Sequence, residues 1–510
     1  MCGFIFISQS SSNRVSINNF VRALKSQDWR GPDAIHHIAL KNERILIGHN
    51  RLSVLDLRAN ADQPMISNND RYVIVFNGEI YNHQLLRKEL KLQCRTSSDT
   101  ETILEGYAQI GEKIIDLLEG MFAFVIYDKL ADTWVCARDS LGIKPLYIYQ
   151  TNNLTVIGSE PGIIADLCKL SVDQVAVEEW KVARRPTPGA SYFLGLKEHL
   201  PGMLSRSDTS TTSYWKLKPS DKSYSQEEFE SLLQESITTH EISDVVNVAL
   251  LSGGLDSAVI TGLSNIKKTY CIGLSENNEF AGAKDTADTL GRELVKVVVD
   301  NNDLVQSWRL LTSMRKEPLS VPNEGLIYLV CKSMNKDEKV VLTGEGADEL
   351  LFGYDGIYRW ACGDVWNGAE SFLRRYGYSD EIKIPMRLLQ FVDDEKEGKS
   401  VIEFVEDFFY KFHLPGLLRR MDFSSMAASK EARVPFVNRK IISYMYRRPP
   451  ELKLSRLESK IPLRRLSMKI GLIGALNRKK VGFSASINTS NNKTMEYKSF
   501  QKIILEELEW

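Results

Sequence analysis

A cysteine stands directly after the initiator methionine in the opening stretch MCGFIFISQ. If Met1 is removed, Cys2 carries a free α-amine that titrates near neutral pH and can accept the proton of its own thiol. The thiolate could then attack a carbonyl, and the oxyanion that forms would need two hydrogen-bond donors. Asn77 and Gly78, at the end of the apolar run in VIVFNGEIYN, offer a side-chain amide and a backbone N–H. The pattern predicts nucleophilic chemistry on a carbonyl.

Two charged residues nearby could hold an amino-acid substrate. Such a substrate needs a cation for its carboxylate and an anion for its ammonium group, and Arg51 in GHNRLSVLD and Asp99 in TSSDTET supply one of each. Each residue alone has an ordinary explanation, because single cysteines are usually packed in a core and Asn-Gly usually forms a turn. Only the complete set indicates a site.

A second set of residues is suited to phosphate. The stretch VALLSGGLDSAV runs from an apolar strand through Ser252–Ser257 into a helix. Its glycines let backbone N–H groups turn toward an anion, and the helix N-terminus adds a positive dipole. Asp256 is suited to hold a magnesium ion that bridges phosphates. The chain's Gly-Lys-Ser at Gly398–Ser400 is no Walker A loop, because Asp393 stands where that motif needs its first glycine.

Acidic residues surround a second glycine-rich turn in VVLTGEGADELLFGY. Glu345, Asp348 and Glu349 could bind magnesium, position a proton acceptor or cap a helix. Function becomes the better interpretation if this turn faces Ser252–Ser257 across a parallel sheet.

Length and composition limit the domain number and the classes of partner. The chain has 510 residues, 43% of them hydrophobic and 26% charged, with a net charge of −1. This predicts two or three full-sized domains and gives no global field for nucleic acid or an anionic membrane. The seven cysteines are odd in number and contain no C-x-x-C, which favours a reducing compartment. With no signal peptide and no membrane-length apolar run, we expect a cytoplasmic protein.

The elements that must position these residues change character along the chain. Residues 1–160 read as short strands with a helix over Asp99–Leu118, which predicts an α+β layered domain. Residues 161–224 are less regular and predict connecting segments, including the polar run Ser205–Ser213. From Ser225 strands and helices alternate, which predicts a parallel doubly wound sheet with ligands beyond the carboxyl ends of its strands.

Several motifs carry a family resemblance. MCGF, RGPD, HNRLSVLD, NGEIYN, SDTE, GMFAF and ARDSLGIKPLY resemble the class II glutamine amidotransferase domain in order and spacing, and LSGGLDS resembles the PP-loop of the N-type ATP pyrophosphatases. With GEGADEL and EARVPFVN downstream, the chain resembles the glutamine-hydrolysing asparagine synthetase family from residue 2 to about Ser484. The resemblance implies an Ntn-type αββα layered sandwich with its connecting segment over residues 1–215. It also implies an α/β parallel-sheet domain, of the PP-loop, adenine nucleotide α hydrolase-like kind, over residues 225–510.

The resemblance also implies roles. At the first site Cys2 would attack the carboxamide of glutamine, Asn77 and Gly78 would stabilise the oxyanion, and Arg51, Glu79 and Asp99 would bind the substrate. At the second site ATP would be bound by Leu251, Ser252, Gly253, Gly254, Asp256, Ser257, Ile272, Gly273 and Gly344, with Asp256 and Asp348 on Mg²⁺. Glu345 would assist the attack of ammonia on an acyl-adenylate, and Lys460 in SRLESKIPLRRL would contact the phosphates. Ammonia would pass through an internal tunnel, the products would include AMP and pyrophosphate, and the enzyme would be a homodimer with no nucleic-acid or membrane partner.

The acceptor of the ammonia is where the sequence departs from the family. MRKEPLSVPNEGLIY keeps Glu317-Pro318 but has Lys316, Ser320 and Asn323 where the family often has Asp, Asp and Ser. Aspartate, amidated through β-aspartyl-AMP, is the favoured acceptor, and another carboxylate such as a sugar uronic acid is the main alternative. A β-lactam-forming ring closure is disfavoured by Cys2, and a non-catalytic sensor by the complete first site.

Overall fold

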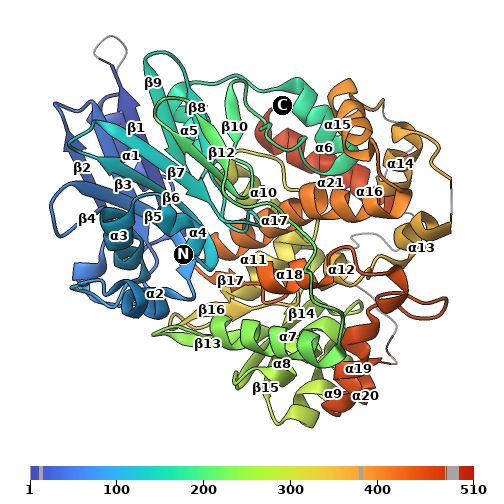
Figure 1. Cartoon of the computed structure of the whole chain (residues 1–510). Coiled ribbons are helices and arrows are strands. Elements are labelled where there is room, and N and C mark those ends of the chain that lie inside the picture. Colours follow the sequence, from blue (N-terminus) through green and yellow to red (C-terminus); the bar gives the residue numbers. More distant parts are fainter. Residues whose placement is uncertain (1, 11–14, 364, 378–382, 477, 479–492) are drawn as a thin grey trace.

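The computed structural model describes residues 2–10, 15–363, 365–377, 383–476, 478 and 493–510. Ser484, where the resemblance ends, lies outside them, as does Met1. The N-terminal region contains two antiparallel sheets, the C-terminal region contains a parallel sheet with many helices, and the two regions lie side by side (Figure 1). This agrees with the predicted α+β and α/β classes.

Two six-stranded sheets form the N-terminal sandwich. The first has the order β10-β8-β9-β1-β3-β2 and the second β12-β11-β7-β6-β5-β4. The strands are β1 (Cys2–Gln9), β2 (Ala34–Leu40), β3 (Ile45–Arg51), β4 (Met65–Ile66), β5 (Tyr72–Ile80), β6 (Gly120–Asp128), β7 (Thr133–Arg138), β8 (Tyr147–Gln150), β9 (Leu154–Gly158), β10 (Leu196–Glu198), β11 (Met203–Arg206) and β12 (Thr211–Ser213). The central strands are buried along nearly their whole length, because each sheet is covered on both faces.

Helices cover the outer face of each sheet. The first sheet is covered by α1 (Ile17–Lys25) and α5 (Pro161–Cys168), and the second by α2 (His83–Leu90), α3 (Asp99–Ile110) and α4 (Lys113–Leu117). The single helix predicted over Asp99–Leu118 is wrong, because Gly111 adopts a positive φ of 64° and ends α3 there. The result is the αββα layering that the resemblance implies.

Residues 161–224, which were predicted to be connecting segments, contain regular secondary structure. They hold α5, α6 (Gln174–Ala183) and β10–β12, and these strands complete an edge of each sheet. The polar run Ser205–Ser213 forms the β11–β12 hairpin, in which Met203 pairs with Ser213. Its polar composition reflects an exposed edge strand rather than a loop.

The parallel sheet places both glycine-rich turns at one edge. Its strands are β13 (Val246–Leu250), β14 (Lys268–Leu274), β15 (Glu293–Val299), β16 (Glu338–Leu342) and β17 (Glu431–Arg433), in the order β15-β14-β13-β16-β17. The strand order reverses at the neighbours β13 and β16, which is where ligands bind in doubly wound sheets. The first turn follows β13 and the second follows β16, so they face each other as predicted.

Helices surround this sheet and extend beyond it (Figure 1). They are α7 (Gln226–His240), α8 (Leu255–Leu263), α9 (Phe280–Leu290), α10 (Asn301–Arg315), α11 (Glu324–Lys332), α12 (Ala347–Leu350), α13 (Asp355–Gly363), α14 (Ala369–Tyr376), α15 (Met386–Lys396), α16 (Val401–Phe408), α17 (Leu414–Met426), α18 (Arg439–Met445), α19 (Ile461–Lys469), α20 (Ile473–Leu476) and α21 (Lys493–Leu508). Ser225 caps α7, because its side chain accepts a hydrogen bond from the Glu228 backbone N–H. Within the described ranges, no helix has the length and apolarity that a bilayer crossing needs.

A buried ion network joins the two regions. Arg30 is fully buried and donates through Nε to the Cys2 carbonyl at 2.9 Å, while its terminal nitrogens donate to Glu160 at 2.5 Å and to Asp422 of α17 at 2.8 Å. Lys144 reaches the same Asp422 at 3.2 Å. A residue of the C-terminal region is therefore connected through a single side chain to the backbone of Cys2.

Candidate functional site

Five of the six predicted residues of the first site line a small pocket, and the sixth, Asn77, is bonded to Cys2 beside it. Cys2 begins β1 and Arg51 ends β3, and the antiparallel register places these two residues opposite each other. Asp99 enters from the first turn of α3, and Gly78 and Glu79 from the end of β5. Strand pairing thus brings together residues that are up to 97 positions apart.

Asn77 has the geometry of an oxyanion donor. Its Oδ1 accepts a hydrogen bond from the Cys2 backbone N–H at 3.0 Å, which directs Nδ2 the other way. Nδ2 is buried, and among the described residues it meets no acceptor. Buried donors are nearly always satisfied, so this one is available to a substrate oxygen. A side chain at Gly78 would collide with the backbone of Met121 and Phe122, so only glycine lets β5 and β6 approach here.

The Cys2 thiol is not pre-ionised. Burial raises its pKa above the ordinary value, and the backbone of Leu52 and the charge of Arg51 only partly offset this. The thiol therefore needs a base to become a nucleophile. An α-amine at the Cys2 nitrogen would be the closest one, held by Asn77.

Arg51 and Asp99 both face this pocket, but their contacts differ. Asp99 accepts backbone hydrogen bonds from Ile80 and Thr100 at 2.8 and 2.9 Å, and burial raises its pKa. The terminal nitrogens of Arg51 donate to the loop after β3, including a 2.5 Å bond to Asp62. A substrate carboxylate would share or replace that bond. Asp62 carried no sequence signal.

The C-terminal region contributes Glu431 to the same pocket. Glu431 belongs to β17 and pairs with Arg433 at 2.6 Å, and Arg433 reaches Glu79 at 3.2 Å. Burial and Asp99 raise the pKa of Glu79, whereas the N-terminal ammonium, Arg433 and Lys144 outweigh burial and lower the pKa of Glu431 to about 2. The motif EARVPFVN contained Glu431, but nothing in the sequence placed it beside Cys2.

This depressed pKa predicts acid sensitivity. The ionised Glu431 stabilises the fold fully above the ordinary carboxyl value of 4.5, and this contribution declines as the pH falls from there toward about 2. We expect urea unfolding of the wild type to show lower stability at pH 4 than at pH 6. In Glu431→Gln the drop should be smaller, because the titrating group is gone. An equal drop in both proteins would contradict the assignment.

Most of the residues predicted for the second site line a second pocket at the edge of the parallel sheet, and the predicted Gly253, Gly254 and Lys460 are not among its lining residues. This pocket receives Leu251, Ser252, Asp256 and Ser257 from the β13–α8 turn, Ile272 and Gly273 from β14, and Gly344, Glu345 and Asp348 from the turn after β16. Ser252 Oγ accepts from the Gly254 N–H at 3.1 Å and lies 3.0 Å from Ser257 Oγ. The Gly253 N–H donates to Glu279 at 3.2 Å. Glu279 was not predicted to belong to this site. Its carboxylate accepts a hydrogen bond from a backbone N–H of the kind that would bind a phosphate.

Two carboxylates of this pocket converge on a single cation. Lys460 Nζ lies 2.6 Å from Asp256 Oδ2 and 2.6 Å from Asp348 Oδ1. Two converging carboxylates fit Mg²⁺, which is commonly held by one or two carboxylates plus substrate phosphates and water. Over the stretches of chain that the structure describes, no cluster of three or more His, Cys, Asp or Glu residues could hold a metal by itself. The site therefore suits a metal that arrives with phosphate.

The other acids of the turn have different environments. Glu345 pairs with Arg420 of α17 at 2.6 Å and lines the pocket. Glu349 accepts from the Tyr354 hydroxyl at 2.6 Å, and burial together with Asp348 and Glu345 raises its pKa to about 8. Glu349 is thus mostly protonated at neutral pH and is a poor proton acceptor there.

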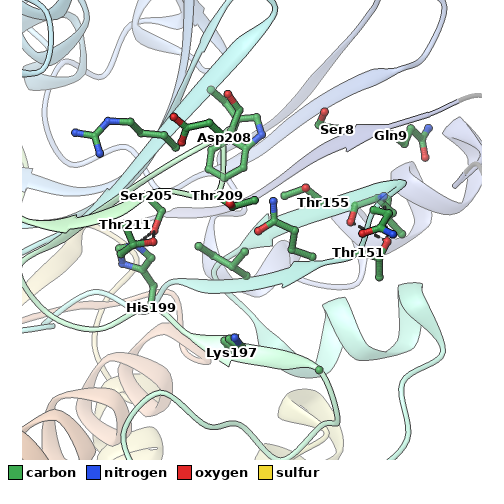
Figure 2. A pocket seen from close by; sticks show the side chains of 18 of the residues that line it. Ser8, Gln9, Thr151, Thr155, Lys197, His199, Ser205, Asp208, Thr209 and Thr211 are labelled. Carbon is green, nitrogen blue, oxygen red and sulfur yellow. Dashed lines mark hydrogen bonds between the residues drawn. The ribbon is translucent and has the colours of Figure 1, made fainter.

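A larger groove of about 1010 Å³ lies away from both pockets, between the β8–β9 hairpin and the β11–β12 hairpin (Figure 2). In it His199 Nε2 lies 2.9 Å from Ser205 Oγ, which lies 2.8 Å from Thr211 Oγ1. Burial lowers the pKa of His199 to about 4, so it is neutral and a poor base for Ser205. The groove carries no catalytic assignment.

Comparisons with known proteins bear on both sites. Residues 1–215 match the family model of the glutamine amidotransferase domain, and residues 228–508 match that of asparagine synthase. The glutamine-hydrolyzing asparagine synthetase 3 of Bacillus subtilis (strain 168) is 30% identical over 480 residues, which are 83% of this chain and 77% of that protein. Asparagine synthetase 1 of the same strain is 27% identical over 96% of this chain and 87% of its own length. Asparagine synthetase B of Escherichia coli (strain K12) is 30% identical over 64% of this chain and 59% of its own length. The chain belongs to the asparagine synthase family.

Proposed function

We propose that the protein amidates a carboxylate with ammonia released from glutamine, and that ATP activates the carboxylate as an adenylate. Aspartate is the acceptor we favour, with asparagine, AMP and pyrophosphate as products. The cofactors are ATP and Mg²⁺. The protein would act on small molecules and would work as a homodimer.

The observation that carries this proposal is the strand pair that joins the two pockets. Glu431 of β17 lines the Cys2 pocket and pairs with Val340 of β16. Two residues further on, the Arg433 carbonyl accepts a hydrogen bond from Thr343, which lines the PP-loop pocket. A short strand pair thus spans from a thiol pocket to an anion pocket, which suits transfer of a small product between them.

At the first pocket each residue has a defined task. The Cys2 α-amine, oriented by Asn77 Oδ1, takes the thiol proton, and the thiolate attacks the glutamine carboxamide. Asn77 Nδ2 and the Gly78 N–H hold the oxyanion. Arg51 binds the glutamine carboxylate, Asp99 its ammonium group, and Glu79 completes the wall. The tetrahedral adduct then breaks its C–N bond, the α-ammonium protonates the leaving nitrogen so that ammonia departs, and water hydrolyses the thioester to glutamate and the free thiol.

At the second pocket the turns bind and orient the nucleotide. Ser252–Ser257 and Gly344 hold the phosphates, and Leu251, Ile272 and Gly273 hold the adenosine. Asp256 and Asp348 would hold Mg²⁺, which would supply positive charge to neutralise the phosphates. Lys460 contacts the phosphates, and Glu345 accepts a proton as ammonia attacks the adenylate.

Another acceptor is the second candidate, because of how residues 314–328 fold. This is the segment whose sequence departs from the family pattern. Glu317 and Glu324 are fully buried and pair with Arg315, and Glu317 also pairs with Arg419. The backbone carbonyls of Leu319 and Pro322 accept from Trp180 and Trp308 at 2.7 Å. Helices around the segment therefore fix much of it, while Glu317 Oε1 and Asn323 Oδ1 are buried and meet no hydrogen-bond donor among the described residues. Because this segment, which the resemblance places near the acceptor, carries Lys316, Ser320 and Asn323 instead of the family's usual residues, a uronic acid or another carboxylate is kept as the second candidate.

An acceptor screen tests the proposal. Purified protein is incubated with glutamine and MgATP plus aspartate, glutamate, a uronic acid or no acceptor, and pyrophosphate and amide are measured. We expect aspartate to stimulate pyrophosphate release in step with asparagine. Stimulation by a uronic acid alone would select the second candidate. Glutamate release without pyrophosphate release for any carboxylate would overturn ATP-dependent amidation.

A further inference from the structure

Lys460 contacts two carboxylates that line the PP-loop pocket, those of Asp256 and Asp348. Its Nζ contacts both oxygens of Asp256, at 2.7 and 2.6 Å, and Asp348 Oδ1 at 2.6 Å. The side chain is only 9% exposed, and those of Asp256 and Asp348 are 17% and 16% exposed. One ammonium group therefore serves as counter-ion to both carboxylates that suit magnesium.

The surrounding chain is shaped to bring Lys460 to this point. Lys460 adopts a positive φ of 58° just before α19, and its N–H donates to the Leu351 carbonyl at 3.2 Å. Gly353 lies against the contact, and its N–H donates to the Asp348 carbonyl at 2.8 Å. A side-chain carbon at Gly353 would collide with both Asp348 Oδ1 and Lys460 Cε. The lysine contact thus depends on a glycine that leaves room for it.

An ammonium group and a divalent cation have opposing requirements here. Mg²⁺ binds oxygen ligands at 2.0–2.1 Å, closer than the ammonium, and a positive charge among those ligands would repel it strongly in a partly buried pocket. The lysine must leave the two carboxylates before the metal can bind them. Once it leaves, the nearest place for its charge is the phosphate group that arrives with the metal.

We propose that Lys460 is an internal counter-ion that blocks Asp256 and Asp348 to free divalent cations and exchanges for the metal only when nucleotide phosphates arrive. The inference rests on the proposed nucleotide site and adds a binding order to it. Metal alone binds weakly, and metal and nucleotide bind together. Lys460 thereby makes the pocket selective for the metal–nucleotide complex.

The test measures Mn²⁺ binding to the full chain without nucleotide. The electron paramagnetic resonance signal of free Mn²⁺ reports how much of the metal remains unbound. Lys460→Met and Lys460→Gln should each bind Mn²⁺ at least about tenfold more tightly than wild type, because a repelling charge is removed. Lys460→Arg, which keeps the charge, should bind it as weakly as wild type. Adding Asp348→Asn to Lys460→Met should cancel the gain.

Controls make the outcome decisive. Lys453→Met removes another buried lysine, which pairs with Glu406 at 2.6 Å instead of with Asp256 or Asp348, and should not tighten Mn²⁺ binding. Thermal unfolding checks that each variant is folded. Unchanged or weaker Mn²⁺ affinity in both folded neutral variants would overturn the proposal. Failure of the wild type to bind Mg²⁺ with a non-hydrolysable ATP analogue would instead refute the proposed nucleotide site, while the Mn²⁺ comparison would still decide the role of Lys460.

Discussion

Cys2→Ala is expected to lower the glutamine-dependent reaction by at least about a thousandfold while leaving the ammonium-dependent reaction near wild type. Among the described residues that line its pocket, the thiol is the group placed to form a thioester, and losing a covalent nucleophile typically costs this much or more. Alanine is smaller than cysteine, so the buried start of β1 can accommodate it without overpacking. Ammonium supplied at high pH bypasses the first site and needs only the PP-loop pocket.

The measurement compares glutamate release with amide formation from glutamine and from ammonium. Cys362→Ala is the matched control, because this cysteine is exposed and belongs to neither pocket. Intact-mass analysis of the wild type should show that Met1 has been removed. Hydrolysis of glutamine by the alanine variant would show that another group is the nucleophile. Loss of both reactions would mean that the change disturbs the fold or the second pocket.

Local patterns in the sequence predicted those segments of the sites that lie on single turns. Ser252–Ser257 and Glu345–Asp348 could be read directly, because glycines, serines and acids between a strand and a helix leave few structures open. The alternation of strands and helices also predicted that the two turns face each other at one edge of a parallel sheet. The helix over Asp99–Leu118 was predicted too long, because periodicity continued across Gly111, where a positive φ breaks it.

Contacts between distant segments could not be predicted in this way. Glu431 in the Cys2 pocket, Arg420 on Glu345 and Asp422 on Arg30 all come from a stretch that the sequence showed only as helix-rich or as a single motif. Their partners are 75 or more residues away, and charge pairing across such separations depends on the packing of whole layers. The strands of residues 196–213 were missed for a related reason, since polar edge strands lack the apolar signal of buried ones.

Glu345→Gln is expected to slow amide formation from ammonium by about a hundredfold or more while leaving adenylation largely intact. Glu345 lines the PP-loop pocket and pairs with Arg420, and general bases commonly contribute this much. Glutamine keeps the size of the side chain and can still accept from Arg420, but it cannot take the proton that ammonia loses as it attacks. Adenylation needs the phosphate and metal ligands, and these remain.

The two steps can be separated by experiment. Acceptor-dependent exchange of labelled pyrophosphate into ATP reports adenylation, and amide formed from ammonium reports the attack. Glu349→Gln is the matched control, because Glu349 is mostly protonated at neutral pH and glutamine resembles that form. It should reduce amide formation far less than Glu345→Gln. Equal losses of exchange and amide formation in Glu345→Gln would place Glu345 in nucleotide or acceptor binding, and a larger loss in Glu349→Gln would transfer the proton-accepting role to Glu349.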